Sequence, residues 1–221
     1  MGLFKEELPV HDTIDRLITR IDPSALQSTF IRCRQEVVKP SEGEVVAVDG
    51  KRLRSSYDRQ SAIHMVSAFD TANGMVIGQT KTVGKSNEIT AIADLLNLLD
   101  IKGCLIIIDA MGCQRKITQT IIDKEADHLI ALKGKQQRLF DNIKQAFACA
   151  NKTATPHMEK EHGRVKAREY HVLDRGDIAK AFPDWTGLKS IGMAINYQHN
   201  DQKESLEYRY YMSPAHGRTI W

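Results

Sequence analysis

The chain has 221 residues, enough to bury a substantial apolar core in one large domain or two small ones. It is 42% hydrophobic and 27% charged, with 14 glycines and 6 prolines, which excludes a low-complexity or disordered chain, and its net charge of +3 is too small to indicate a nucleic-acid partner by itself. No apolar run approaches the roughly 20 residues that cross a bilayer, and no export signal is readable, so we expect a cytoplasmic bacterial protein with no membrane partner. The cysteines form no C-x-x-C pair, so we expect reduced thiols.

Residues 1–44 are predicted to form a partial helical segment. A first helix is indicated by apolar residues at helical spacing, namely Ile14, Leu17 and Ile18. A second helix is expected over residues 24–36, with an apolar face made of Leu26, Phe30 and Cys33. A Pro-Ser-Glu-Gly stretch then breaks the helical pattern.

Three strands are predicted next, over residues 45–49, 62–69 and 75–81. The first is a continuous apolar run that ends in Asp49, which is typical of a buried central strand. The other two are separated by a turn that contains Asn73-Gly74, a strong hairpin signal, so they should be antiparallel neighbours.

Alternating helices and strands follow the predicted hairpin. They are a helix over 86–99, a strand over 104–109, a helix over 114–126, a strand over 128–132 and a helix over 136–149. A compact strand-helix-strand unit requires a parallel pair, so this order defines an α/β domain over residues 45–149. The segments after it alternate with period two, which predicts a β-rich insertion over residues 150–221.

Two acids, Asp49 and Asp109, end two of the apolar strands. Open α/β sheets bind ligands at the carboxyl ends of their strands, where these side chains could meet. Neighbouring carboxylates repel each other unless they share a cation, and Mg²⁺ is an oxygen-preferring ion that also binds phosphate esters, so the pair indicates metal-assisted phosphoryl transfer. The alternative is that each aspartate ends a strand or caps the following turn. The strand order, with acids on the first and fourth strands, favours the ribonuclease H-like layout.

Six segments of the chain resemble the H-repeat-associated, ISAs-group transposases of bacterial insertion sequences. They are VVAVDGKRLR (45–54), GQTKTVGKSNEITAI (78–92), IIIDAMGCQ (106–114), HLIALKGKQ (128–136), HGRVKAREYHVLD (162–174) and SLEYRYYMS (205–213). The resemblance implies a DDE transposase with a ribonuclease H-like mixed sheet (βββαβαβα) and a β-rich insertion. It also implies Mg²⁺ or Mn²⁺ as cofactor, with Asp49 and Asp109 as the first two metal-binding catalytic acids. Its implied partners are the terminal inverted repeats of the element, target DNA and a second copy in a homo-oligomer.

The third acid of the family is a glutamate on a helix beyond the β insertion, and this sequence has no match for it. The N-terminal helical region is also shorter than in the family, so the expectation is a transposase truncated at both ends and inactive. Two alternatives stay open: a non-catalytic DNA-binding remnant, and a Mg²⁺-dependent nuclease that uses Asp49, Glu88 and Asp109. Glu88 starts a predicted helix where ribonuclease H places a metal ligand, although an acid is also favoured there by the helix dipole alone.

Basic residues gather near the predicted site. Those that could hold a DNA phosphate are Lys51, Arg52, Arg54 and Lys85, with ordinary solvated loop charge as the alternative. The resemblance further implies DNA contact by three residues of one family motif: His162, Arg164 and Arg168.

Overall fold

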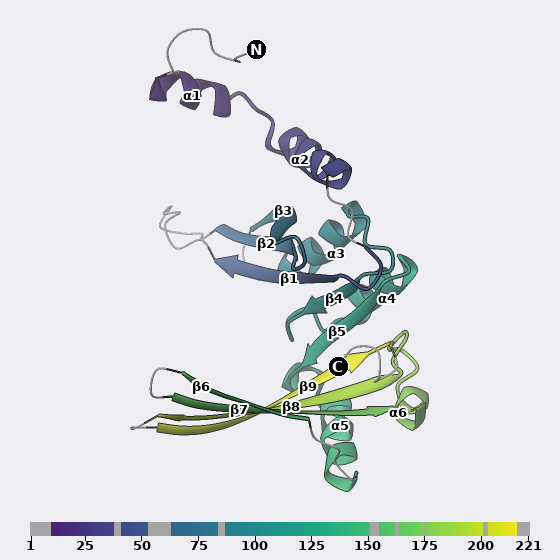
Figure 1. Cartoon of the computed structure of the whole chain (residues 1–221). Coiled ribbons are helices and arrows are strands. Elements are labelled where there is room, and N and C mark those ends of the chain that lie inside the picture. The colour runs from purple at the N-terminus through teal and green to yellow at the C-terminus, as the bar shows by residue number, and fades with distance from the viewer. Residues whose placement is uncertain are drawn as a thin grey trace.

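The described strands form one nine-stranded sheet of order β3-β2-β1-β4-β5-β9-β8-β7-β6, seen in the computed structural model of Figure 1. The structure describes residues 10–37, 41–52, 63–83, 87–150, 155–161, 164–174, 176–200 and 203–215. Within these ranges, no helix is long and apolar enough to span a membrane.

The first half of the sheet has the predicted ribonuclease H-like topology. An antiparallel meander is formed by β1 (Val45–Arg52), β2 (Ile63–Asp70) and β3 (Met75–Val83). The expected hairpin turn joins β2 to β3, with Gly74 at φ 63°, a left-handed conformation that favours glycine. On its other side β1 pairs in parallel with β4 (Leu105–Ile108), and β4 pairs in parallel with β5 (Asp127–Leu132), which confirms the predicted strand-helix-strand unit.

Three helices cover one face of the sheet. They are α3 (Glu88–Leu98), α4 (Arg115–Asp123) and α5 (Gln137–Cys149), the last preceded by the 3₁₀ turn η2 (Gly134–Gln136). The register partners Val48, Ile108 and Ile130 are buried under the helices. Their neighbours on the opposite face, among them Ala47 and Ile107, are only half-buried. We call this second face the helix-free face, because none of α3, α4 and α5 packs on it.

The predicted β-rich insertion continues the core sheet. Its strands are β6 (Thr155–Glu161), β7 (Arg164–Asp174), β8 (Ser190–Asn200) and β9 (Lys203–Ser213), all antiparallel to their neighbours. The two halves join where β9 pairs with β5, with Met212 opposite Ile130. The alternating pattern predicted strands in this region but not the short helix α6 (Gly176–Ala181).

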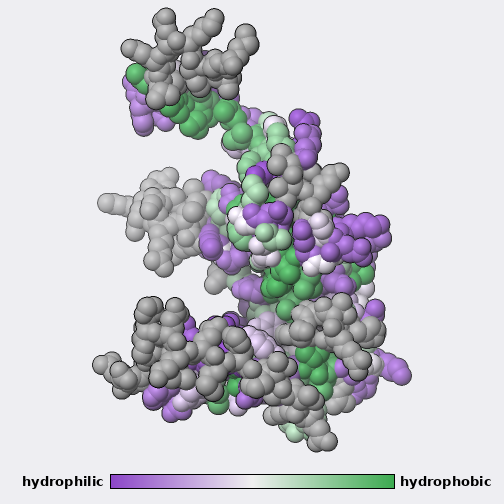
Figure 2. Space-filling view, in the orientation of Figure 1, coloured by the Kyte–Doolittle hydropathy of each residue, from purple (hydrophilic) through white to green (hydrophobic). Residues whose placement is uncertain are grey.

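The N-terminal helices are α1 (His11–Ile18) and α2 (Pro23–Val37), close to the predicted ranges. The predicted apolar face of α2 is not its buried face, because Leu26 and Phe30 are 53% and 42% exposed and Cys33 is exposed, whereas Ile31 is buried. Helix α2 packs on the edge strand β3. Helix α1 buries no residue, and Figure 2 shows hydrophobic side chains along both helices at the top of the molecule.

Candidate active site

Asp49 and Asp109 are neighbours on adjacent parallel strands. Val48 lies opposite Ile108 in the β1–β4 ladder, and each acid is the next residue along its strand. Strand β4 ends at Ile108, but β1 continues to Arg52, so Asp49 lies within a strand and Asp109 lies in the loop that follows one. The structure thus brings the two predicted acids to the same edge of the core.

The side chain of Asp49 lies on the helix-free face, because successive residues of a strand point to opposite faces and both of its neighbours face the helices. It is 59% exposed and lies 3.8 Å from the ammonium of Lys51, measured from Oδ2 to Nζ. Ion pairs this exposed contribute little to stability. Asp49 is therefore open to a ligand from solvent.

Asp109 orders the loop after β4. Its Oδ1 accepts a hydrogen bond from the backbone N–H of Met111 at 2.9 Å. The backbone carbonyl of Asp109 accepts another hydrogen bond from the N–H of Gly112 at 3.1 Å. The turn-capping role considered for a strand-end aspartate is present, and it also fixes the direction of the carboxylate.

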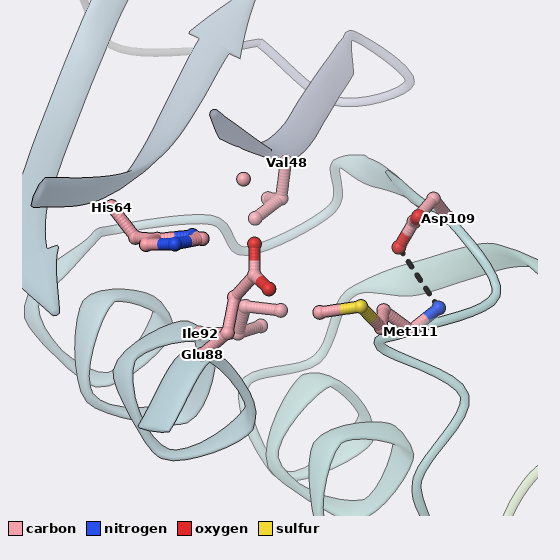
Figure 3. Close-up of a pocket in the computed structure, with 7 residues that line it drawn as sticks. Val48, His64, Glu88, Ile92, Asp109 and Met111 are labelled. Atoms are coloured by element: carbon pink, nitrogen blue, oxygen red, sulfur yellow. Dashed lines mark hydrogen bonds between the residues drawn. The ribbon is translucent and has the colours of Figure 1, made fainter. Parts of the chain in front are cut away.

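A cavity of about 480 Å³ opens beside Asp109 on the helix side of the sheet. It is lined by Val48, Gly50, His64, Glu88, Ile92, Asp109 and Met111. In Figure 3, Glu88 lies in the middle of this cavity, with His64 on one side and Asp109 and Met111 on the other. Asp49 is not among the lining residues, so the structure gathers Glu88 and Asp109 but leaves Asp49 on the opposite face.

The carboxylate of Glu88 reaches the sheet because Gly50 has no side chain. Glu88 is the first residue of α3 and is only 6% exposed. A Cβ added to Gly50 would lie 1.5 Å from Oε1 of Glu88, far inside van der Waals contact. Neither Gly50 nor His64 was predicted to belong to the site. Gly50 could have been found, because a glycine inside a strand often marks close approach of another group. His64 carried no such signal.

The donor set fits a magnesium or manganese ion in kind, since both prefer carboxylate oxygens. Asp49 and Asp109 would supply two such ligands from neighbouring strands. In the ranges that the structure describes, no three histidine, cysteine, aspartate or glutamate side chains are grouped so that they could hold one ion. The described part of the chain therefore offers an incomplete metal site.

The basic residues predicted to contact DNA are only partly described. Lys51 is exposed beside Asp49, and Arg168 lines a separate cavity in the insertion. Arg54, Lys85 and His162 lie outside the described residues, as do the side chains of Arg52 and Arg164. Trp185 is 4% exposed and belongs to the core, so it is not open to a DNA base.

The fold and the paired acids define a ribonuclease H-like protein with an acidic site at one edge of its sheet. Residues 28–210 match the family described as "Transposase DDE domain". The chain is 43% identical over 227 residues to "Putative transposase YncI" of Escherichia coli O157:H7, a match that covers 96% of this chain and 57% of the relative. It is 42% identical over 227 residues to "H repeat-associated putative transposase YhhI" of Escherichia coli K12, covering 97% of this chain and 60% of the relative. The chain belongs to the DDE transposase family.

The chain spans 57% and 60% of the lengths of these two relatives. Among solved structures, the piggyBac transposase synaptic complex with hairpin DNA aligns over 93% of this chain and 40% of that one, at 8% identity and a TM-score of 0.47. That similarity is too low to bear on fold or function, and the fold assignment follows from the strand order.

Proposed function

We propose that the chain carries part of the DNA strand-cleavage site of an insertion-sequence transposase, with Asp49 and Asp109 as its first two catalytic acids. The observation that supports this most strongly is the β1–β4 register, which makes the two acids neighbours at one edge of the sheet. Their substrates would be the terminal inverted repeats of the element and target DNA, bound by a homo-oligomer.

Each residue has a role that follows from its surroundings. Asp49 meets DNA from the helix-free face because it is exposed there. Asp109 offers its carboxylate in a direction fixed by the N–H of Met111, and Lys51 adds positive charge for a phosphate. A Mg²⁺ or Mn²⁺ ion held by the two acids would polarise a phosphate oxygen and activate water.

The 221-residue polypeptide, tested alone, should not complete the reaction. Two-metal phosphoryl transfer needs ligands for both ions, and the described residues gather no third ligand for the pair. Mg²⁺ gives up its water reluctantly, so each lost carboxylate weakens binding. We propose that this polypeptide, tested alone, binds one ion and DNA without cutting.

A second candidate is a Mg²⁺-dependent nuclease that uses Glu88. The cavity shared by Glu88 and Asp109 favours it, because both carboxylates face one space. The nuclease as predicted also needs Asp49, which does not line this cavity.

Plasmid nicking with Mg²⁺ or Mn²⁺ separates the two candidates. The chains compared are the wild type, Asp49→Asn, Glu88→Gln and the control Glu125→Gln, which alters an exposed acid paired with Lys102. We expect none of these four chains to nick the plasmid. A version extended with the C-terminal part of YhhI should nick it, and this activity should be lost in Asp49→Asn and kept in Glu88→Gln. Nicking by the 221-residue chain that is lost in Glu88→Gln would replace the proposal with the nuclease.

A further inference from the structure

A second cavity, of about 280 Å³, lies in the insertion on strands β7, β8 and β9. Apart from Ala194 and the acid Glu207, the described lining residues are basic, aromatic or amide-bearing, among them Lys166, Arg168, Tyr170, Asn196, Arg209 and Tyr211. Nothing in the cleavage site described above requires this cavity, which lies several strands away from Asp49.

The lining side chains form rows across the three strands. Arg168 lies opposite Asn196, which lies opposite Glu207, and the next row joins Tyr170 to Arg209 through Ala194. Because register partners point to the same face of a sheet, these groups share one surface. The arrangement is therefore set by the strand ladder and does not depend on loops.

The cavity carries a surplus of positive charge. Among the described residues, three cations and one acid line it, a surplus of two positive charges. The acid, Glu207, accepts a hydrogen bond from Arg209 at 2.9 Å, which lowers the pKa of Glu207 and keeps it ionised. Lys166 and Arg168 are half-buried, and no other described side chain forms an ion pair with either of them. Both cations line the cavity, so an anion that enters it would meet them.

Tyrosines and amides surround the cations. Tyr170 and Tyr211 line the same space, and burial raises the pKa of Tyr211, so its hydroxyl stays protonated. Asn196 adds an amide that can donate and accept hydrogen bonds. Cations for phosphates beside hydroxyl and amide groups are the contacts that proteins use to hold a DNA backbone.

The cavity opens on the same face of the sheet as Asp49. Val48, Ile108, Ile130 and Met212 are linked by register and all face the helices. Asp49 directly follows Val48 and Tyr211 directly precedes Met212, so the side chains of Asp49 and Tyr211 both lie on the helix-free face. Strand β9 runs antiparallel to β5. Arg209, which precedes Tyr211 on β9, is therefore nearer than Tyr211 to the sheet edge where β1 and β4 have their carboxyl ends.

We infer that Lys166, Arg168 and Arg209 form a binding site for DNA backbone phosphates, and that one duplex lies along the helix-free face between this site and Asp49. The placement of the duplex rests on the proposed function. The phosphate contact itself needs no metal ion, so the two are separable by experiment.

Fluorescence anisotropy with a labelled random-sequence duplex, measured without metal over a range of salt concentrations, tests the inference. The variant is Lys166→Ala/Arg168→Ala. The matched control, Lys116→Ala/Lys144→Ala, removes the same charge from exposed positions on α4 and α5, behind the sheet. Each phosphate contact contributes about 0.9 to the magnitude of the slope of log K against log salt concentration. We therefore expect the slope of the variant to be smaller in magnitude by about 1.8 and the slope of the control to equal that of the wild type. Lys166→Glu serves as a second variant and should weaken binding further, and the melting temperature of each chain shows that it is folded.

Equal affinity and slope in the wild type and Lys166→Ala/Arg168→Ala would overturn the inference and leave the proposed function standing. Equal losses in the variant and the control would also overturn it, because the effect would then follow net charge alone. If inorganic pyrophosphate displaces the duplex only from the wild type, the site is a phosphate site, as inferred. If no chain binds the duplex, the inference fails together with the DNA-binding part of the proposed function, while metal binding at Asp49 remains separately measurable.

Discussion

Replacing Gly50 by alanine tests whether Glu88 is held against β1 as the structure shows. The new Cβ would lie 1.5 Å from Oε1 of Glu88, whereas ordinary contact begins near 3.4 Å, so the carboxylate must move by about 2 Å. Overpacking typically costs about 1–3 kcal/mol, and since the displaced atom ends a flexible side chain we expect about 1 kcal/mol. The same alanine is favoured over glycine in a strand by about 0.5–1 kcal/mol when nothing obstructs it.

The sign of the effect should therefore depend on Glu88. In the wild type, Gly50→Ala should lower the free energy of unfolding, and in a Glu88→Ala background it should raise it. Urea unfolding of the four chains gives a coupling energy that equals the overpacking cost, which we expect to be about 1 kcal/mol. Equal effects of Gly50→Ala in both backgrounds would refute the contact and, with it, the shape of the Glu88 cavity.

Three further predictions concern stability and reactivity. Burial lowers the pKa of His128 to about 4, below its value in the unfolded chain. Between these two pKa values the unfolded chain binds more protons than the folded chain, so the free energy of unfolding should fall by about 2 kcal/mol from about pH 7 to about pH 5. In urea unfolding, His128→Leu should reduce this loss. Phe147→Ala empties a buried position under Tyr210 and should cost about 3–5 kcal/mol, whereas Leu206→Ala, at a side chain 56% exposed, should cost under about 0.5; similar losses would contradict the packing. Burial raises the pKa of Cys104 to about 11 and that of Cys113 to about 12. Iodoacetamide at about pH 8 should therefore label only the exposed Cys33 and Cys149 in the folded chain, as measured by mass spectrometry. Labelling of all four cysteines would contradict the burial of Cys104 and Cys113.

The core of the fold was predictable because its signals are local. Continuous apolar runs identified β1 and β4, and Asn73-Gly74 identified the hairpin. Each signal reports the burial or turn geometry of its own segment. Chain order then determined which strands are parallel.

What the sequence did not show depends on partners distant along the chain. Helix α2 has apolar residues on more than one side, and only the position of β3 selects Ile31 for burial. The joining of the insertion to the core through β5 and β9 has no local signal. The same holds for the site: Asp49 and Asp109 were predicted to be neighbours, but strand alternation places Glu88 and Asp49 on opposite faces.

The account depends most on a divalent ion shared by Asp49 and Asp109. A crystal of this chain soaked in Mn²⁺ and measured at the manganese absorption edge would locate such an ion directly. We predict one anomalous peak within about 2.2 Å of a carboxylate oxygen of each acid, and no such peak in Asp109→Asn. An ion found instead between Glu88 and His64, or no ion at either place, would contradict the account.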